Sequence, residues 1–160
     1  MQNNPTAKQP TYGIDFKGGD YDSNHSGLTL ATSCKGKVRN GMCIVFTNET
    51  NKVNGIALAP LLNMIDTLNG IAVSGLVNGL VSSCVSPPAL VNGVVISSLL
   101  SIVKTANGLI ISPINAAQKI NGMQLGVVNA TRELHGVQFG LINYADNGFV
   151  KWFPIFNIAI

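Results

Sequence analysis

Charge is what this sequence has least of. Charged residues make up 11% of its 160 residues, against roughly 25% in typical soluble domains, while hydrophobic residues reach 46%. No charged residue occurs between Asp66 and Lys104. Because a folded monomer normally carries ionised groups on its surface, we expect this stretch to be enclosed, covered by another copy of the chain, or in contact with lipid.

Basic residues are sparse as well. The net charge is only +3, and the one basic cluster, Lys35, Lys37 and Arg39, is so short that it is expected to be a solvated face. Nucleic-acid binding is therefore not expected. A chain of this length suffices for one domain with its own core.

Potential metal ligands are few and wrongly spaced. The cysteines Cys34, Cys43 and Cys84 form no CxxC or Cys/His pattern, which argues against a zinc site. Cys34 and Cys43 would pair if neighbouring coils stack them; otherwise they are small buried hydrophobic residues. The acidic residues within 15–22 lack the ligand count of an EF-hand loop. Neither a metal nor a cofactor is expected.

No group of residues looks like catalytic machinery. The two histidines, His25 and His135, occupy variant turns, and neither has a serine or cysteine at a spacing that implies a nucleophile and its base. Glu133 and Asp146 lie about one repeat apart and are expected to be loop charges. No phosphate-binding loop or dinucleotide fingerprint is present. The chain is predicted not to be an enzyme.

What the sequence does contain is an internal repeat headed by Asn-Gly. With the variants Ser26-Gly27 and His135-Gly136, it places glycines at 27, 41, 55, 70, 93, 108, 122 and 136, at spacings of 14, 14, 15, 23, 15, 14 and 14. The long interval contains an extra Asn78-Gly79 and an insertion around Pro87-Pro88. Recurrence in register is the signature of a repeat architecture.

Each repeat reads as a strand followed by a short return. Residues 122–129 and 136–143 alternate apolar and other positions, which is typical of a half-buried strand, and Asn-Gly suits turn positions with φ > 0. Fourteen or fifteen residues are too few for a helical hairpin but enough for one coil of a narrow solenoid. We predict an all-β solenoid of eight or nine coils, in which Asn129 stacks above Asn143.

A helical alternative remains open for the middle of the chain. Residues 56–85 could also form a membrane hairpin, with Gly75-x-x-x-Gly79 as a small-residue packing motif. The interval between Gly70 and Gly93 favours this alternative most. Against it, Asn recurs through the apolar run, and glycine is costly in helices.

We expect a polar lead-in or tether over residues 1–24 and a single solenoid domain over 25–160. Aromatic residues gather near the C-terminus, where we expect them to cap the open stack. The alternative is an aromatic platform that binds sugar or membrane. The residues concerned are Tyr144, Phe149, Trp152, Phe153 and Phe156.

Residues 122–160 resemble bacterial surface-repeat proteins known from spirochaetes and the Bacteroidetes. The shared features are the repeat Asn-Gly-apolar-Gln-apolar-Gly-apolar-apolar-Asn and the closing segment Trp152-Phe153-Pro154-Ile155-Phe156-Asn157. Residues 40–120 depart from this pattern. The resemblance implies an envelope, lipoprotein-like or secreted location and supplies no catalytic residue. The polar N-terminal segment lacks a signal-peptide core, so in an exported protein the signal would already have been removed.

These observations lead to two hypotheses. The first is a non-enzymatic bacterial surface or secreted module, a structural and interaction scaffold that forms homo-oligomers. The alternative is a membrane-inserting protein, toxin-like or pore-forming, that uses the uncharged stretch 67–103. The sequence indicates no small-molecule ligand. The residues expected to contact either another copy or lipid are Leu76, Val77, Leu80, Leu99 and Leu100.

Overall fold

The computed structural model describes residues 11–18, 24–80 and 90–160, and throughout these ranges the regular elements are strands. They are β1 (Thr11–Asp15), β2 (Asn24–Ala59), β3 (Leu62–Ser74), β4 (Val77–Leu80), β5 (Leu90–Ser97), β6 (Leu100–Ile111), β7 (Ile114–Leu125), β8 (Val128–Ala145) and β9 (Trp152–Ala159). The prediction of an all-β solenoid is confirmed. The helical alternative is wrong, because the described part of its segment forms strands in β2, β3 and β4.

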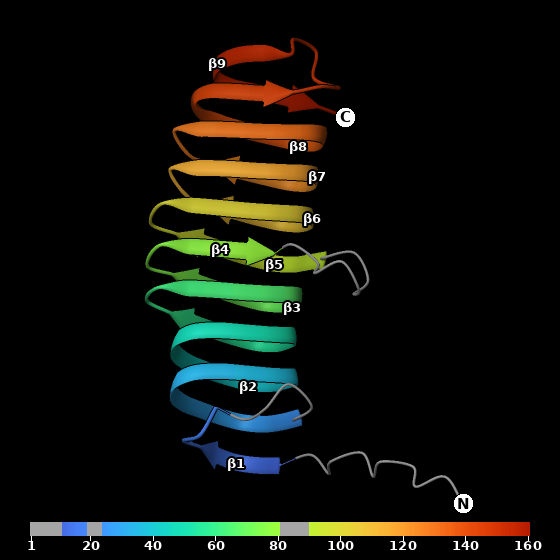
Figure 1. Cartoon of the computed structure of the whole chain (residues 1–160). Helices are drawn as coiled ribbons and strands as arrows, with labels where there is room; N and C mark the ends of the chain where they lie inside the picture. The colour runs from blue at the N-terminus through green and yellow to red at the C-terminus, as the bar shows by residue number, and fades with distance from the viewer. Residues whose placement is uncertain (1–10, 19–23, 81–89) are drawn as a thin grey trace, which may run out of the picture.

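The chain winds into a flattened coil, and the coils lie one above another along a single axis (Figure 1). Successive coils pair in parallel and in register, so that equivalent residues of each repeat hydrogen-bond to one another. This register survives the long interval, since Gly70 of β3 pairs with Gly93 of β5. The stack has about eight turns, each contacting only its neighbours, as in other repeat folds.

The glycine of each Asn-Gly pair is required by close packing between coils. Gly108 has φ +142°, in the left-handed region that favours glycine, and a Cβ added there would lie 2.0 Å from the carbonyl oxygen of Gly93. The same contact recurs from coil to coil. The predicted positive φ of these turns is therefore confirmed, and steric exclusion of a side chain explains why glycine returns at this position. We call the set the glycine ladder, and its members are Gly27, Gly41, Gly55, Gly70, Gly93, Gly108, Gly122 and Gly136.

The core is a thin column of side chains, and its most regular members lie two positions before and two positions after each glycine. In the middle coils it is aliphatic, with Leu68, Val95 and Ile120 almost fully buried. At the two ends the same positions hold polar residues. His25 and Arg39 are 2% and 3% exposed, and Gln124 and Gln138 are fully buried.

The burial of His25 and Arg39 differs from what the sequence predicts. His25 is expected at a variant turn and Arg39 on a solvated face, yet both occupy the core position that Leu68 fills further along the stack. The first coil supplies a partner for each of them. His25 hydrogen-bonds to Thr11 Oγ1 at 3.0 Å, and Arg39 pairs with Asp15 at 3.2 Å. A buried charge needs such partners.

Two columns of asparagine amides run along the stack. The outer column precedes the glycine ladder and consists of Asn40, Asn54, Asn69, Asn92, Asn107 and Asn121, each donating Nδ2 to the side-chain oxygen of the residue one coil earlier. The inner column is buried and comprises Asn48, Asn63, Asn78, Asn115, Asn129 and Asn143. The predicted stacking of Asn129 on Asn143 is confirmed, with Asn129 Nδ2 2.8 Å from Asn143 Oδ1.

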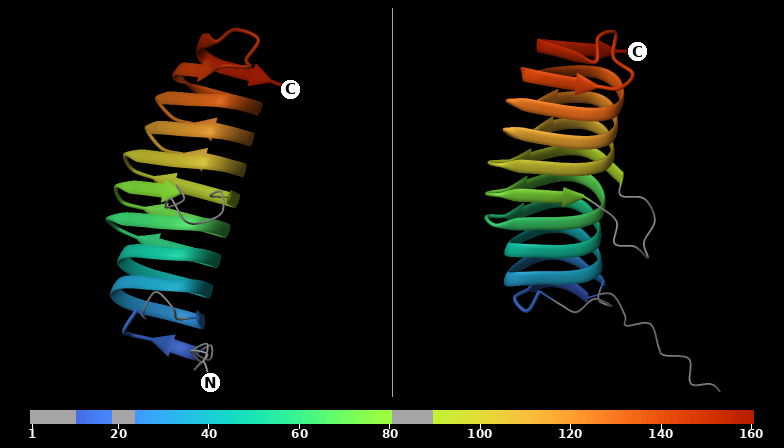
Figure 2. Two further views of the ribbon diagram at one scale, coloured as in Figure 1. Left: turned by 45° about the vertical axis from the view of Figure 1, so that its right-hand side comes forward. Right: turned by 45° about the horizontal axis from the view of Figure 1, so that its top comes forward.

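The two ends of the solenoid are closed differently (Figure 2). At the N-terminal end, β1 pairs in parallel with β2, so the segment 1–24, expected as a lead-in, contributes a strand to the stack. At the C-terminal end, β9 reverses direction and pairs antiparallel with β8. This reversal covers the last coil and forms the predicted aromatic cap.

Candidate functional site

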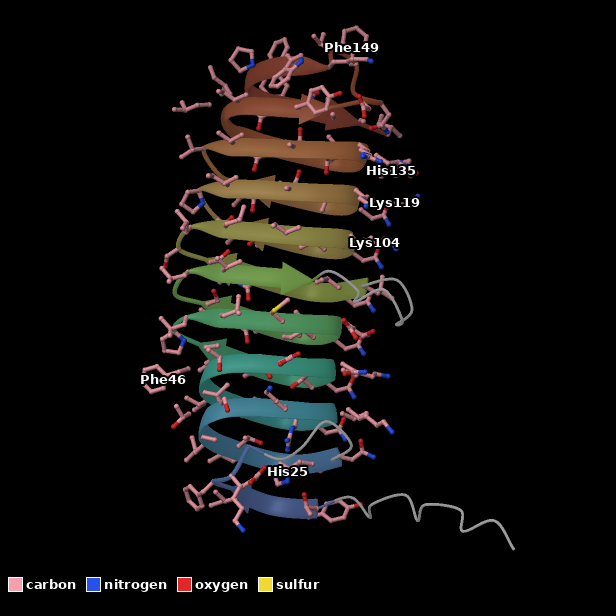
Figure 3. All side chains as sticks on the ribbon, in the orientation of Figure 1. His25, Phe46, Lys104, Lys119, His135 and Phe149 are labelled. Carbon is pink, nitrogen blue, oxygen red and sulfur yellow. The ribbon has the colours of Figure 1, made fainter. Side chains whose placement is uncertain are left out.

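Charge is segregated to one corner of the coil. Between Gly41 and Ala145 every charged residue falls three to six positions before a ladder glycine. Figure 3 shows Lys104 and Lys119 along one edge of the stack and Phe46 on the opposite edge. We call this edge the charged corner, and the charged residues in question are Glu49, Lys52, Asp66, Lys104, Lys119, Arg132 and Glu133.

The charged corner carries exposed ion pairs. Lys119 Nζ lies 2.5 Å from Glu133 Oε1, and His135 Nε2 lies 3.0 Å from the same oxygen. The hydrogen bond from Lys119, followed by that from His135, holds the pKa of the Glu133 carboxyl below its usual value. Exposed pairs of this kind contribute little to stability. They keep this edge hydrated, and they engage His135 in an ion pair with Glu133.

A broad face of the sheet is aliphatic in every coil. Residues one and three positions after each ladder glycine point outward, and all are half-buried or exposed. We call this surface the aliphatic face. It consists of Leu28, Leu30, Met42, Ile44, Ile56, Leu58, Ile71, Val73, Val94, Ile96, Leu109, Ile111, Met123, Leu125, Val137 and Phe139.

The bend that follows this face is aliphatic too. Its backbone is hydrogen-bonded from coil to coil, as in the bond from Leu61 N to Phe46 O, and its side chains project into solvent. We call it the aliphatic bend, with members Phe46, Leu61, Leu76, Leu99, Pro113, Val127 and Leu141. Together with the aliphatic face it forms one surface without charge.

The structure places four of the five predicted contact residues on or beside this bend. Leu76 and Leu99 are 48% and 50% exposed and belong to it. Val77 and Leu100, the next residues, are half-buried and pair with each other between β4 and β6. Leu80 pairs through its backbone with Val103. The uncharged surface is wider than the predicted stretch, however, because the same positions are aliphatic in the other coils and not only within 67–103.

The size of the surface distinguishes it from ordinary surface hydrophobicity. The exposed large side chains on the aliphatic face and bend together present on the order of 1,000 Å², whereas the largest apolar patch on a typical monomer is about 300–600 Å². One partner in a standard protein interface contributes about 800 Å². The aliphatic surface is therefore large enough to form a specific interface.

Four of the aromatic residues form the cap as two pairs of rings tilted against each other. The ring centroids of Tyr144 and Trp152 are 4.7 Å apart, and those of Phe153 and Phe156 are 5.3 Å apart. Phe149 stands apart from them and is almost fully exposed. A shallow hollow of about 180 Å³ lies beside the cap, lined by Leu141, Ile142, Asn143, Trp152, Phe153 and Pro154.

This hollow lacks the convergent polar groups of a ligand site. Its one side-chain amide, that of Asn143, already donates to the carbonyl oxygens of Gly140 and Phe153. Apart from the indole N–H of Trp152, the remaining side chains that line it are apolar. The geometry therefore fits a cap better than a sugar-binding platform, which needs hydrogen-bonding groups beside its rings.

Within the described ranges, no group of three or more His, Cys, Asp or Glu side chains is arranged to hold a metal ion. The search of those same residues for a helix long and apolar enough to cross a membrane also found none. Asp20, Asp22 and Cys84 lie outside the described residues. Comparison of the chain with models of known protein families, with curated proteins and with solved structures yields no match.

Proposed function

We propose that this protein is a non-enzymatic structural module that self-associates through its aliphatic face and aliphatic bend. The observation that carries the proposal is the segregation of charge, which leaves one continuous uncharged surface along the stack. In the assembled state the charged corner faces water. The resemblance of residues 122–160 to bacterial surface-repeat proteins supports placing the assembly at a cell surface or outside the cell.

A second copy of the chain fits this surface for geometric reasons. Two β-sheet faces pack about 10 Å apart with their side chains interdigitated, and here each face repeats the same outward positions at the spacing of β-strands, about 4.8 Å. Two such faces match each other in register all along their length. Repetition of one weak contact over many coils gives a stable association.

Lipid is the other occupant that an uncharged surface would accept. Three features argue against lipid and favour a second copy of the chain. The lysines Lys52, Lys104 and Lys119 lie at the charged corner, away from the aliphatic face, so they would not reach anionic headgroups beside an inserted face. Trp152 and Tyr144 gather at one end only. Finally, the described residues within 67–103 pair with coils on both sides, so they would not insert without breaking those ladders.

Two glutamates on the aliphatic face test the proposal. We expect wild-type protein to form a discrete oligomer in detergent-free buffer, and Ile71→Glu/Met123→Glu to associate at least about a hundredfold more weakly, because an unpaired charge would be buried at the interface. Both positions are more than a third exposed, so the fold should persist. Sedimentation velocity over a range of concentrations, with circular dichroism for folding, measures both effects.

The matched control adds the same charge at the charged corner. Asn51→Glu/Gln118→Glu changes two exposed residues there and should leave the oligomer intact. A wild-type protein that stays monomeric at high concentration would refute self-association. Aggregation that detergent reverses, together with flotation on phosphatidylcholine vesicles that the Ile71→Glu/Met123→Glu variant loses, would assign the surface to lipid instead.

A further inference from the structure

The N-terminal coils contain two cysteines at core positions. Cys34 takes the place that asparagine fills in the inner column, and Cys43 takes the place of Ala57 and Ala72, two residues after a ladder glycine. The two thiols are 1% and 2% exposed. In the other coils these positions are occupied by residues without redox chemistry. The two cysteines therefore make the N-terminal end of the core chemically different from the rest.

The fold brings the two thiols together. Cys34 and Cys43 belong to one buried cluster with Val45 and Ala59, and their side chains share a hydrogen bond. Cys34 Sγ also lies 3.8 Å from Thr50 Oγ1. Both cysteines are free thiols in the structure. The contact crosses the thin core within one turn of the coil, where cysteines nine residues apart in sequence face each other.

A buried guanidinium stands beside them. Arg39 is held by Asp15, by the carbonyl oxygen of Gly18 at 2.5 Å and by the carbonyl oxygen of Lys35 at 2.8 Å. These contacts fix its positive charge within the polar end of the core. A cation next to a thiol favours the thiolate, which is the form that attacks disulfides.

We propose that Cys34 and Cys43 are a redox-active dithiol that closes to a disulfide, independently of the self-association proposed above. The oxidant is a small-molecule disulfide. The Cys34 thiolate attacks one of its sulfurs, forming a mixed disulfide and releasing one thiolate. The Cys43 thiol then loses its proton and attacks Cys34 Sγ, which releases the second thiol. Two protein thiols are oxidised and one small-molecule disulfide is reduced to two thiols.

The two cysteines have different roles in this sequence. The pKa of the Cys34 thiol is lowered to about 7, mainly because Cys43 donates a hydrogen bond to it and also because of Arg39, although burial opposes this shift. The pKa of Cys43 is raised, because its proton is held in that bond and because it is buried. Cys34, whose Sγ also lies 3.8 Å from Thr50 Oγ1, is assigned the attacking role and Cys43 the resolving one.

Oxidation requires the N-terminal end of the stack to open, because both thiols are buried. At this end β1 pairs with β2, and Lys35 N donates a hydrogen bond to the carbonyl oxygen of Gly18 at 3.1 Å. Terminal coils of a repeat protein open more readily than inner ones. Opening of the first coil exposes the thiols, and the disulfide then ties residues 34 and 43 together across the core.

Oxidation of the full-length chain tests the proposal. The background is Cys84→Ser, which removes the third thiol, and the oxidant is glutathione disulfide under native conditions. We expect the intact mass to fall by two hydrogen atoms, both thiols to resist alkylation in denaturant, and the melting temperature to rise by about 5 °C. Thiols that remain alkylatable in denaturant after prolonged incubation would overturn the proposal.

Single variants separate the two roles. In the same background, Cys43→Ser should accumulate a stable glutathione adduct on Cys34, whereas Cys34→Ser should form an adduct at least tenfold more slowly. Circular dichroism establishes that each variant is folded, and Cys→Val variants replace any that is not. Equal adduct formation by both variants, or a stable adduct in the protein that retains both cysteines, would contradict the assignment.

Discussion

Gly108→Ala is expected to destabilise the solenoid by more than about 4 kcal/mol. The added Cβ would lie 2.0 Å from the carbonyl oxygen of Gly93, and the backbone at this position has φ +142°. The obstructing atom is backbone whose position is fixed by the sheet ladder, so relief requires separating two coils. Urea unfolding followed by far-ultraviolet circular dichroism measures the loss in the free energy of unfolding.

A second glycine in the same fold provides the control. Gly79 lies in β4 outside the glycine ladder, and the nearest atoms to an added Cβ are 3.9 Å away. Gly79→Ala should therefore change the free energy of unfolding by less than about 1 kcal/mol. If both variants unfold at the same urea concentration, close packing of glycines is not what holds adjacent coils in register.

Asn129→Asp is expected to cost about 3–5 kcal/mol at neutral pH. Asn129 is fully buried. It accepts a hydrogen bond from Asn115 at 2.7 Å and donates to Phe139 O and Asn143 Oδ1, each at 2.8 Å. An aspartate there keeps the first bond but turns both donations into contacts between oxygen atoms. Its negative charge would also be buried without a cation.

The pH dependence of this variant has a definite sign. Burial and the two facing oxygens should raise the pKa of the new carboxyl in the folded state above its unfolded value. The folded state then binds a proton that the unfolded state has lost, so stability falls as pH rises. Urea unfolding should show Asn129→Asp recovering stability, relative to wild type, between pH 7 and pH 4. A pH-independent difference would contradict this account.

The outer column supplies the matched substitution. Asn107→Asp introduces the same carboxyl into the exposed column, where Asn107 donates to Asn92 and accepts from Asn121. Water solvates the charge there, so the cost should stay below about 1 kcal/mol and change little with pH. If Asn107→Asp lowered the free energy of unfolding as much as Asn129→Asp does, burial of the amide column would not explain the cost of the charge.

The coil itself could be predicted from sequence because its signals are local. The glycine spacing, the alternation in residues 122–129 and 136–143, and the need for positive φ at Asn-Gly all concern neighbouring residues in the chain. The stacking of Asn129 on Asn143 followed directly from the repeat length. None of these inferences required knowledge of which side of the coil faces the core.

The orientation around the coil could not be predicted in this way. Two sets of asparagines recur with the same period, and only the bends decide that the inner set is buried and the outer set is exposed. For the same reason, the sequence alone assigns the charge-free surface to residues 67–103. It extends over all coils, because the charges in the other repeats lie at a single corner.

His25 and Arg39 illustrate a different limit. Polar side chains favour solvent by default, and nothing within their own repeats indicates otherwise. Their partners Thr11 and Asp15 come from β1, a strand in a segment whose polar composition predicts a tether. The interior of the first coils depends on that long-range pairing, which no local pattern in the sequence reveals.

The constant register also determines how the chain can fold. Most residues pair with a partner 14 or 15 positions away, so each new coil closes a loop of nearly the same length and entropy. Such short-range pairing is uncommon among all-β proteins, whose distant contacts usually make folding slow. Folding of this chain can nucleate at any aliphatic coil, and the neighbouring coils then add one after another. The polar N-terminal coils, which contain the two thiols, should be the last to fold and the first to unfold.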